Sequence, residues 1–137
     1  MLVSLMLAAG AVSATPPNPD WNCDDPMVQQ EMNWCAHQDF LEADAELNRQ
    51  WAKTSAMFKE RDIQWMDGHG NQDDGRPGYF PTLLEAQRAW LKYRDAHCRG
   101  EGYYARGGSL EPLLVATCKT NLTRKRTEQL KELAENP

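Results

Sequence analysis

The feature that most constrains the fold is one long segment, from Pro26 to Asp62, that contains no glycine and no further proline. Asp25 and Pro26 are typical of a helix start, because a carboxylate caps the first turn and proline is tolerated at the first helical position. Apolar residues then recur at intervals of three and four, which predicts a single long helix with a buried stripe. The stripe comprises Met32, Ala36, Phe40, Ala43, Leu47, Trp51, Thr54 and Phe58. A second, weaker apolar stripe predicts neighbours on more than one flank of this helix.

Two glycine-rich segments divide the rest of the chain. Met66–Pro81 and Gly100–Gly108 have compositions typical of loops. Thr82 is expected to cap a helix that runs to about Arg99, and Ser109 is expected to cap a third helix. The inner face of the third helix is expected to contain Leu114, Val115, Cys118, Leu122, Gln129 and Leu133. No strand pattern occurs, so we expect an all-α, three-helix antiparallel bundle.

The helical domain is expected to span residues 26–134, and the chain before it is interpreted differently. Residues 1–14 form a short apolar run that ends in small residues, which is typical of a secretory signal peptide. The run is too short to span a bilayer. An extended, proline-rich segment, residues 15–25, follows it. An N-terminal core helix is the alternative for residues 1–14, because no Lys or Arg precedes the apolar run.

Four cysteines, Cys23, Cys35, Cys98 and Cys118, predict two disulfides in a short exported chain. An antiparallel register of the first two helices favours Cys35 with Cys98, which leaves Cys23 for Cys118. Cys23 with Cys98 and Cys35 with Cys118 is the competing arrangement. No two cysteines have the short spacing of a zinc site. Bulky and polar residues precede Cys23, so we expect neither lipid attachment at this cysteine nor a membrane anchor.

A second unusual feature is that Gln87 and Arg94 share the apolar face of the second helix with Trp90. A buried guanidinium is costly unless a carboxylate meets it. We therefore expect a buried polar network that fixes the register of the helices. Its members are expected to be Asp39, Asp44, Asn48, Gln87 and Arg94. A solvent-reached patch that serves recognition is the alternative.

The charge balance limits the possible partners. The chain has 15 basic and 20 acidic residues and a formal net charge of −5. This balance argues against nucleic acid or an anionic membrane and permits a basic protein partner. His37, His69 and His97 accompany no serine or cysteine in a nucleophile motif, so we expect neither an enzyme nor a cofactor.

The first loop also fails as a calcium site. Gln72 and Gly78 occupy the sixth and twelfth positions of a loop that begins at Asp67, where the helix-loop-helix calcium motif needs glycine and glutamate. An irregular ion site of Asp67, His69 and Asp73 is the alternative to a plain loop. We expect no bound metal.

Four motifs carry a resemblance to a known family. They are MNWC ending at Cys35, EADAELNRQW from Glu42 to Trp51, LLEAQRAWLKYRDAHC from Leu83 to Cys98, and GGSLEP leading to Cys118, Thr123 and Arg126. With these motifs, the chain resembles the LprI-like lysozyme inhibitors, which are small exported bacterial helical domains. The resemblance implies a periplasmic or secreted protein that inhibits lysozyme by stoichiometric binding. A cell-envelope structural or stress-related module without affinity for lysozyme is the alternative function.

The exposed residues best suited to contact a lysozyme are expected in the two loops. Aromatic side chains on glycine-flanked loops make good interface anchors. An acidic protein also associates faster with a basic one, as animal lysozymes are. The candidates are Asp73, Asp74, Tyr79 and Phe80 in the first loop, and Tyr103, Tyr104 and Arg106 in the second.

Overall fold

The computed structural model describes residues 15–70 and 73–136. The segment interpreted as a signal peptide, residues 1–14, lies outside these ranges. Within them, none of the helices combines the length and the apolar character needed to cross a membrane.

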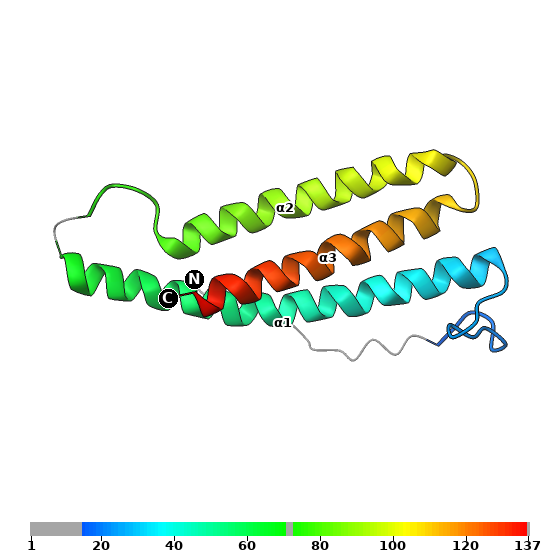
Figure 1. The fold of residues 1–137 in the computed structure, drawn as a ribbon, viewed down its shortest axis with the longest axis horizontal. Coiled ribbons are helices and arrows are strands. Elements are labelled where there is room, and N and C mark those ends of the chain that lie inside the picture. Colours follow the sequence, from blue (N-terminus) through cyan, green and yellow to red (C-terminus); the bar gives the residue numbers. More distant parts are fainter. Residues whose placement is uncertain (1–14, 71–72, 137) are drawn as a thin grey trace, which may run out of the picture.

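Three long helices form the molecule, and a 3-10 helix joins the last two. The elements are α1 (Gln29–His69), α2 (Tyr79–Gly102), η1 (Tyr103–Ala105) and α3 (Glu111–Glu135). Figure 1 shows α1 and α3 running in one direction and α2 in the other. No strand occurs in the described ranges, so the expected all-α bundle of three helices with two disulfides is confirmed.

Helix α1 begins and ends later in the chain than the sequence predicted. The expected start at Asp25 and Pro26 is wrong, because α1 starts at Gln29 and its N-cap residue makes no side-chain hydrogen bond. At its other end, α1 continues to His69. Gly70 then ends the helix: it has a φ of 54°, and its N–H donates to the Met66 carbonyl. A glycine inside a helix costs only about 1 kcal/mol. Gly68 therefore lies inside α1, which extends beyond the expected end at Asp62.

The chain before α1 is held by Glu31 in the first turn of the helix. One carboxylate oxygen of Glu31 accepts the N–H of Met27 at 2.6 Å, and the other accepts the N–H of Asn22 at 2.8 Å. These bonds to backbone N–H groups, that of Met27 first, lower the pKa of Glu31. Trp21 lies beside Trp34 of α1, with ring centroids 6.3 Å apart. The folded-back segment thus depends on a charged Glu31.

Replacing Glu31 by glutamine is expected to loosen this segment at neutral pH. Because the folded pKa lies below the ordinary value of 4.5, the stabilisation is complete above that value and is lost as the pH falls through the folded pKa. Near-ultraviolet circular dichroism of the Trp21–Trp34 pair should report the loss in acid for the wild type, and at neutral pH for E31Q. Glu42→Gln, at an exposed position on α1, is the control. Identical titration curves for wild type and E31Q would contradict this role.

Helix α2 is capped by a residue of α1. The carboxylate of Asp62 accepts the backbone N–H groups of Tyr79 and Phe80, at 2.5 and 3.0 Å. The expected cap, Thr82, lies inside the helix instead. A Cβ at Gly78 would come 2.5 Å from the Asp62 carboxylate, so any other residue there would have to displace this carboxylate from the cap. This contact fixes where the loop returns to α1.

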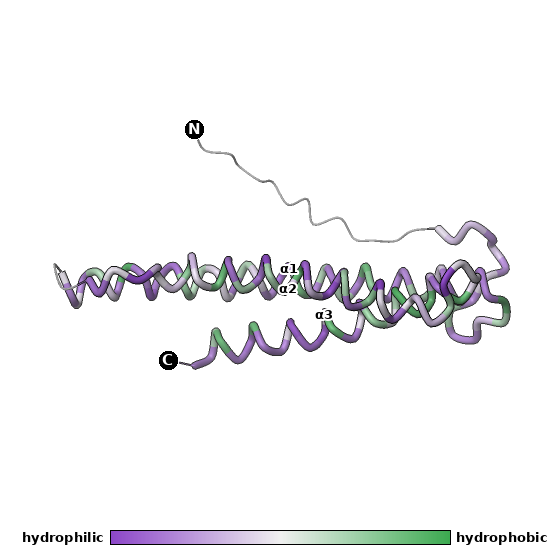
Figure 2. The backbone as a smooth tube through the Cα atoms, turned by 90° about the horizontal axis from the view of Figure 1, so that it is seen from above, coloured by the Kyte–Doolittle hydropathy of each residue, from purple (hydrophilic) through white to green (hydrophobic). Residues whose placement is uncertain are grey.

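The apolar core lies where the three helices meet. Leu47, Phe58, Leu83 and Leu130 form its centre. Four half-buried residues pack around them: Trp51, Phe80, Trp90 and Leu133. Seen from above in Figure 2, α1 and α2 overlie one another and α3 lies to one side. The three helices therefore form a triangular bundle around the core, and their axes do not lie in one plane.

Helix α3 turns a threonine-rich face inward. Its buried residues include Thr120, Thr123 and Thr127, whereas Gln129, expected on this face, is exposed. The Thr127 hydroxyl donates to the Thr123 carbonyl at 3.0 Å, so this polar group is satisfied without leaving the helix. A count of apolar residues misses such a face, because threonine hydroxyls bonded to their own helix can be buried at little cost.

Candidate partner-binding site

Both disulfides tie the same end of the bundle. Cys23 is bonded to Cys35 and Cys98 to Cys118, with Cα atoms 5.5 and 5.4 Å apart. Both pairings considered from the sequence, Cys35–Cys98 with Cys23–Cys118 and Cys23–Cys98 with Cys35–Cys118, are wrong. The register of α1 against α2 was the wrong guide, because each cysteine has a nearer partner along the chain. The folded-back segment returns Cys23 to α1, and η1 returns the chain from Cys98 to Cys118.

The two crosslinks thereby brace one surface built from three segments. These are the start of α1, the α2–α3 connection and the start of α3 (Figure 1). The Asn33 amide on α1 donates to the Ser109 carbonyl at 2.9 Å and joins the first segment to the second. Large apolar side chains remain exposed here, and we call them the tip patch: Met27, Val28, Tyr103, Tyr104 and Leu110. An exposed apolar group on a braced backbone is a candidate interface.

The two tyrosines of the tip patch stand on a fixed turn. Tyr104 is 92% exposed and Tyr103 is 47% exposed, with the Arg106 guanidinium 4.6 Å from the Tyr103 ring. The Gly108 N–H donates to the Ala105 carbonyl at 2.8 Å. These contacts hold the backbone of the turn, so this backbone has little conformational entropy left to lose on binding.

The residues expected in the first loop lie at the opposite end of the bundle. Helix α2 has 24 residues, and a rise of about 1.5 Å per residue separates its ends by roughly 35 Å. Asp73, Asp74 and Tyr79 are exposed at that far end, whereas Phe80 is half-buried against the core. The structure therefore splits the expected contact residues into two groups that cannot enter one cleft together.

The far end also has a different shape and charge from the tip patch. An open cavity of about 730 Å³ is lined there by Phe58, Trp65 and Tyr79, together with Asp74 and Arg76. Arg76 forms a salt bridge with Asp74 and lowers the pKa of that carboxyl group. The charge of Asp74 is thus partly neutralised, and a concave surface does not fit into an enzyme cleft.

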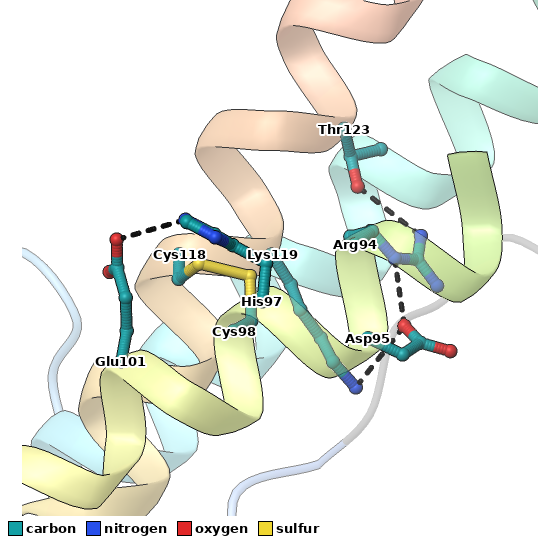
Figure 3. Close-up of a disulfide and its surroundings, with 8 residues drawn as sticks. All are labelled: Arg94, Asp95, His97, Cys98, Glu101, Cys118, Lys119 and Thr123. Atoms are coloured by element: carbon teal, nitrogen blue, oxygen red, sulfur yellow. Dashed lines mark hydrogen bonds and ion pairs between the residues drawn. A yellow bond between two sulfur atoms is a disulfide. The ribbon is translucent and has the colours of Figure 1, made fainter. Parts of the chain in front are cut away.

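Arg94 lies at the centre of a polar network between the helices. Its side chain is buried, and its guanidinium donates to Asp44 of α1 at 3.3 Å, to Thr123 of α3 at 3.3 Å and to Asp95 at 3.0 Å. Figure 3 shows the bonds to Thr123 and Asp95. The guanidinium also lies over the ring of Phe40, 5.1 Å from its centroid. One side chain of α2 therefore contacts both neighbouring helices.

Gln87 is buried in a second, separate group. Its side-chain carbonyl accepts the Nε–H of Arg126 at 2.9 Å. Arg126 is a residue of α3 that the sequence analysis did not place in the network. Burial lowers the pKa of Arg126. Asp39 and Asn48, which were expected as members, are exposed. Their placement was wrong because the register was drawn for α1 and α2 alone, whereas α3 supplies Thr123 and Arg126.

Comparison with known proteins places this arrangement in a family. The family model described as lysozyme inhibitor LprI matches residues 22–130. A protein of Rhizobium meliloti (strain 1021), described as uncharacterized, is 43% identical over 135 residues, which cover 98% of this chain and 93% of the relative. No solved structure matches. The family is one of inhibitors and not of enzymes. Because the match covers most of the chain, the protein belongs to the LprI lysozyme inhibitor family.

Proposed function

We propose that this protein is exported and inhibits a lysozyme by stoichiometric binding through the tip patch. The observation that carries the proposal is the braced end of the bundle, where Tyr103 and Tyr104 are exposed on a turn inside the loop that the Cys98–Cys118 disulfide closes. The family match supports lysozyme as the partner. An exposed aromatic turn at the end of the bundle is suited to enter an active-site cleft and exclude the polysaccharide.

The proposed export is supported by the two disulfides and by the apolar N-terminal segment. Disulfides form and persist in oxidising compartments, and all four cysteines of this chain are paired. The apolar segment at residues 1–14 is the corresponding candidate for a signal peptide. Both features support a periplasmic or secreted location, where a lysozyme acts.

The proposed binding should depend on salt. A chain with a net charge of −5 gains association rate with a basic lysozyme through electrostatic steering, and dissolved salt screens that gain. The apolar contacts of the tip patch should instead govern the dissociation rate.

A titration of the oxidised protein against a lysozyme acting on bacterial cell walls tests the proposal. We expect loss of activity at a one-to-one ratio, and a Tyr104→Ala variant that binds about tenfold more weakly, since truncating an anchor removes on the order of 1–2 kcal/mol. Tyr93→Ala is the matched control, because Tyr93 is 54% exposed but lies on α2 away from the turn. Calorimetry gives both affinities.

Two other results would contradict this reading in different ways. Full activity at micromolar excess, with no heat of binding, would favour the envelope module without affinity for lysozyme. Inhibition that is unchanged in Tyr104→Ala but weakened in a D73N/D74N double variant would move the contact to the far end of the bundle.

A further inference from the structure

Two metal-ligating side chains, His97 and Glu101, lie beside the Cys98–Cys118 disulfide. A nitrogen of His97, a carboxylate oxygen of Glu101 and the sulfur of Cys118 all lie within 4.8 Å of one another. His97 and Glu101 are one turn apart on α2, and their Nε2 and Oε1 atoms are 3.3 Å apart. Figure 3 shows both side chains on the same side of the disulfide, with Cys98 next to His97 in the chain.

We propose that reduction of this disulfide converts the cluster into a Zn²⁺ site formed by Cys98, Cys118, His97 and Glu101. Two thiolates, an imidazole and a carboxylate are all ligands that zinc accepts in a four-coordinate site. The spacing of the cysteines alone gave no sign of this site, because its ligands come from two helices. The His97–Glu101 pair, four residues apart, is the signal in the sequence that could have indicated it.

The disulfide and the metal site exclude each other. A dithiol or phosphine reductant supplies two electrons and two protons, which break the S–S bond and leave two thiols. Zinc then replaces the two thiol protons, because only the thiolate is a good ligand. A sulfur held in the disulfide has no such proton to lose. The oxidised protein should therefore keep only His97 and Glu101 as ligands, which give weak binding.

The geometry fits a metal ion after small movements. Bonds of about 2.0–2.3 Å to zinc put the donor atoms of a tetrahedral site roughly 3.3–3.8 Å apart. Shifts on the order of 1 Å bring the donors of His97, Glu101 and Cys118 to these distances. The Cys98 sulfur lies outside this group of three and must turn toward the ion once the S–S bond is broken. The two cysteines are buried, and the side chains of His97 and Glu101 are 42% and 50% exposed. The ion would thus be shielded on its sulfur side and reached from solvent on the other. Tyr93 stacks on the His97 ring, with centroids 5.2 Å apart, and fixes its direction.

Metal titration of the full chain in its two redox states tests the site. In the phosphine-reduced protein we expect Co²⁺ to give a thiolate charge-transfer absorption, and Zn²⁺ to displace it and raise Tm. The oxidised protein should show neither effect. His97→Ala and Glu101→Gln should each weaken zinc binding by about tenfold or more in a competition assay, since even residues that only orient a ligand contribute 10–100-fold. His37→Ala and Glu85→Gln, at exposed positions elsewhere, are the matched controls.

The second cysteine pair needs its own control, because Cys23 and Cys35 are also thiols after reduction. A C23A/C35A variant should retain the absorption, and a C98A/C118A variant should lose it. Equal zinc affinity in wild type, H97A and E101Q would overturn the proposal. So would a reduced chain, folded or unfolded, that binds no Zn²⁺. None of these results depends on affinity for lysozyme, so the two proposals stand or fall separately.

Discussion

Replacement of Arg94 by alanine is expected to lower the free energy of unfolding by about 3 kcal/mol. This value is typical of substitutions that replace a large buried side chain by a small one. The stem of Arg94 fills space between the helices, and its head lies over Phe40 and Trp90, 5.1 and 5.2 Å from the ring centroids. Alanine would leave a cavity there and remove the donor to Thr123 of α3. The loss comes from packing and hydrogen bonds more than from stranded charge, because the side chains of Asp44 and Asp95 are 36% and 52% exposed.

Two further variants separate these causes. Arg94→Met keeps most of the volume without the charge and should cost less than Arg94→Ala, since apolar replacements of buried ion pairs are often tolerated. Asp44→Asn keeps the shape, and its partly solvated salt bridge should contribute no more than about 1 kcal/mol. Urea unfolding followed by far-ultraviolet circular dichroism gives all three values. An unfolding curve of R94A that matches wild type, or an R94M variant as unstable as R94A, would contradict the explanation that packing of the Arg94 side chain stabilises the bundle.

Periodicity was sufficient to predict the architecture. The stripe on α1 contains Leu47 and Phe58 of the core, and the glycine-rich segments correctly divide the chain into three helices. The ends of the helices could not be predicted in the same way, because remote or unexpected groups cap them. Asp62 of α1 caps α2 across a loop, and Glu31 holds the chain that precedes its own helix. Local rules for caps consider neighbours in sequence, and these partners are neighbours in space.

The candidate site was only partly accessible from the sequence for the same reason. The unusual inward positions of Gln87 and Arg94 were visible as a pattern on one helix, and both side chains are buried. Their partners on α3, Thr123 and Arg126, required the position of a third helix that a pairwise register does not supply. The exposed tyrosines of the second loop could be named, but their place at the same end of the bundle as Met27 and Val28 follows from the arrangement of the three helices.

Loss of the Cys98–Cys118 crosslink is expected to lower the free energy of unfolding by about 3 kcal/mol in the chain-entropy model, for a closed loop of 20 residues. Each disulfide expected from the sequence would have closed a longer loop and contributed about 1 kcal/mol more. A C98A/C118A variant is preferable to serines, because Cys98 is fully buried and a hydroxyl there would need a partner. Metal-free buffer excludes any contribution from zinc.

The C98A/C118A variant should also show whether the crosslink contributes to binding apart from its contribution to stability. Without the crosslink, the turn that carries Tyr103 and Tyr104 must be ordered when a lysozyme binds, at a cost on the order of 1 kcal/mol per side chain. Affinity should therefore fall by about tenfold even at temperatures where the helices remain folded. The C23A/C35A variant, with a shorter loop and no bond to the turn, should lose slightly less stability and less affinity. If both double variants kept the affinity of wild type, the crosslinks would contribute nothing to binding, whatever the stabilities of the variants.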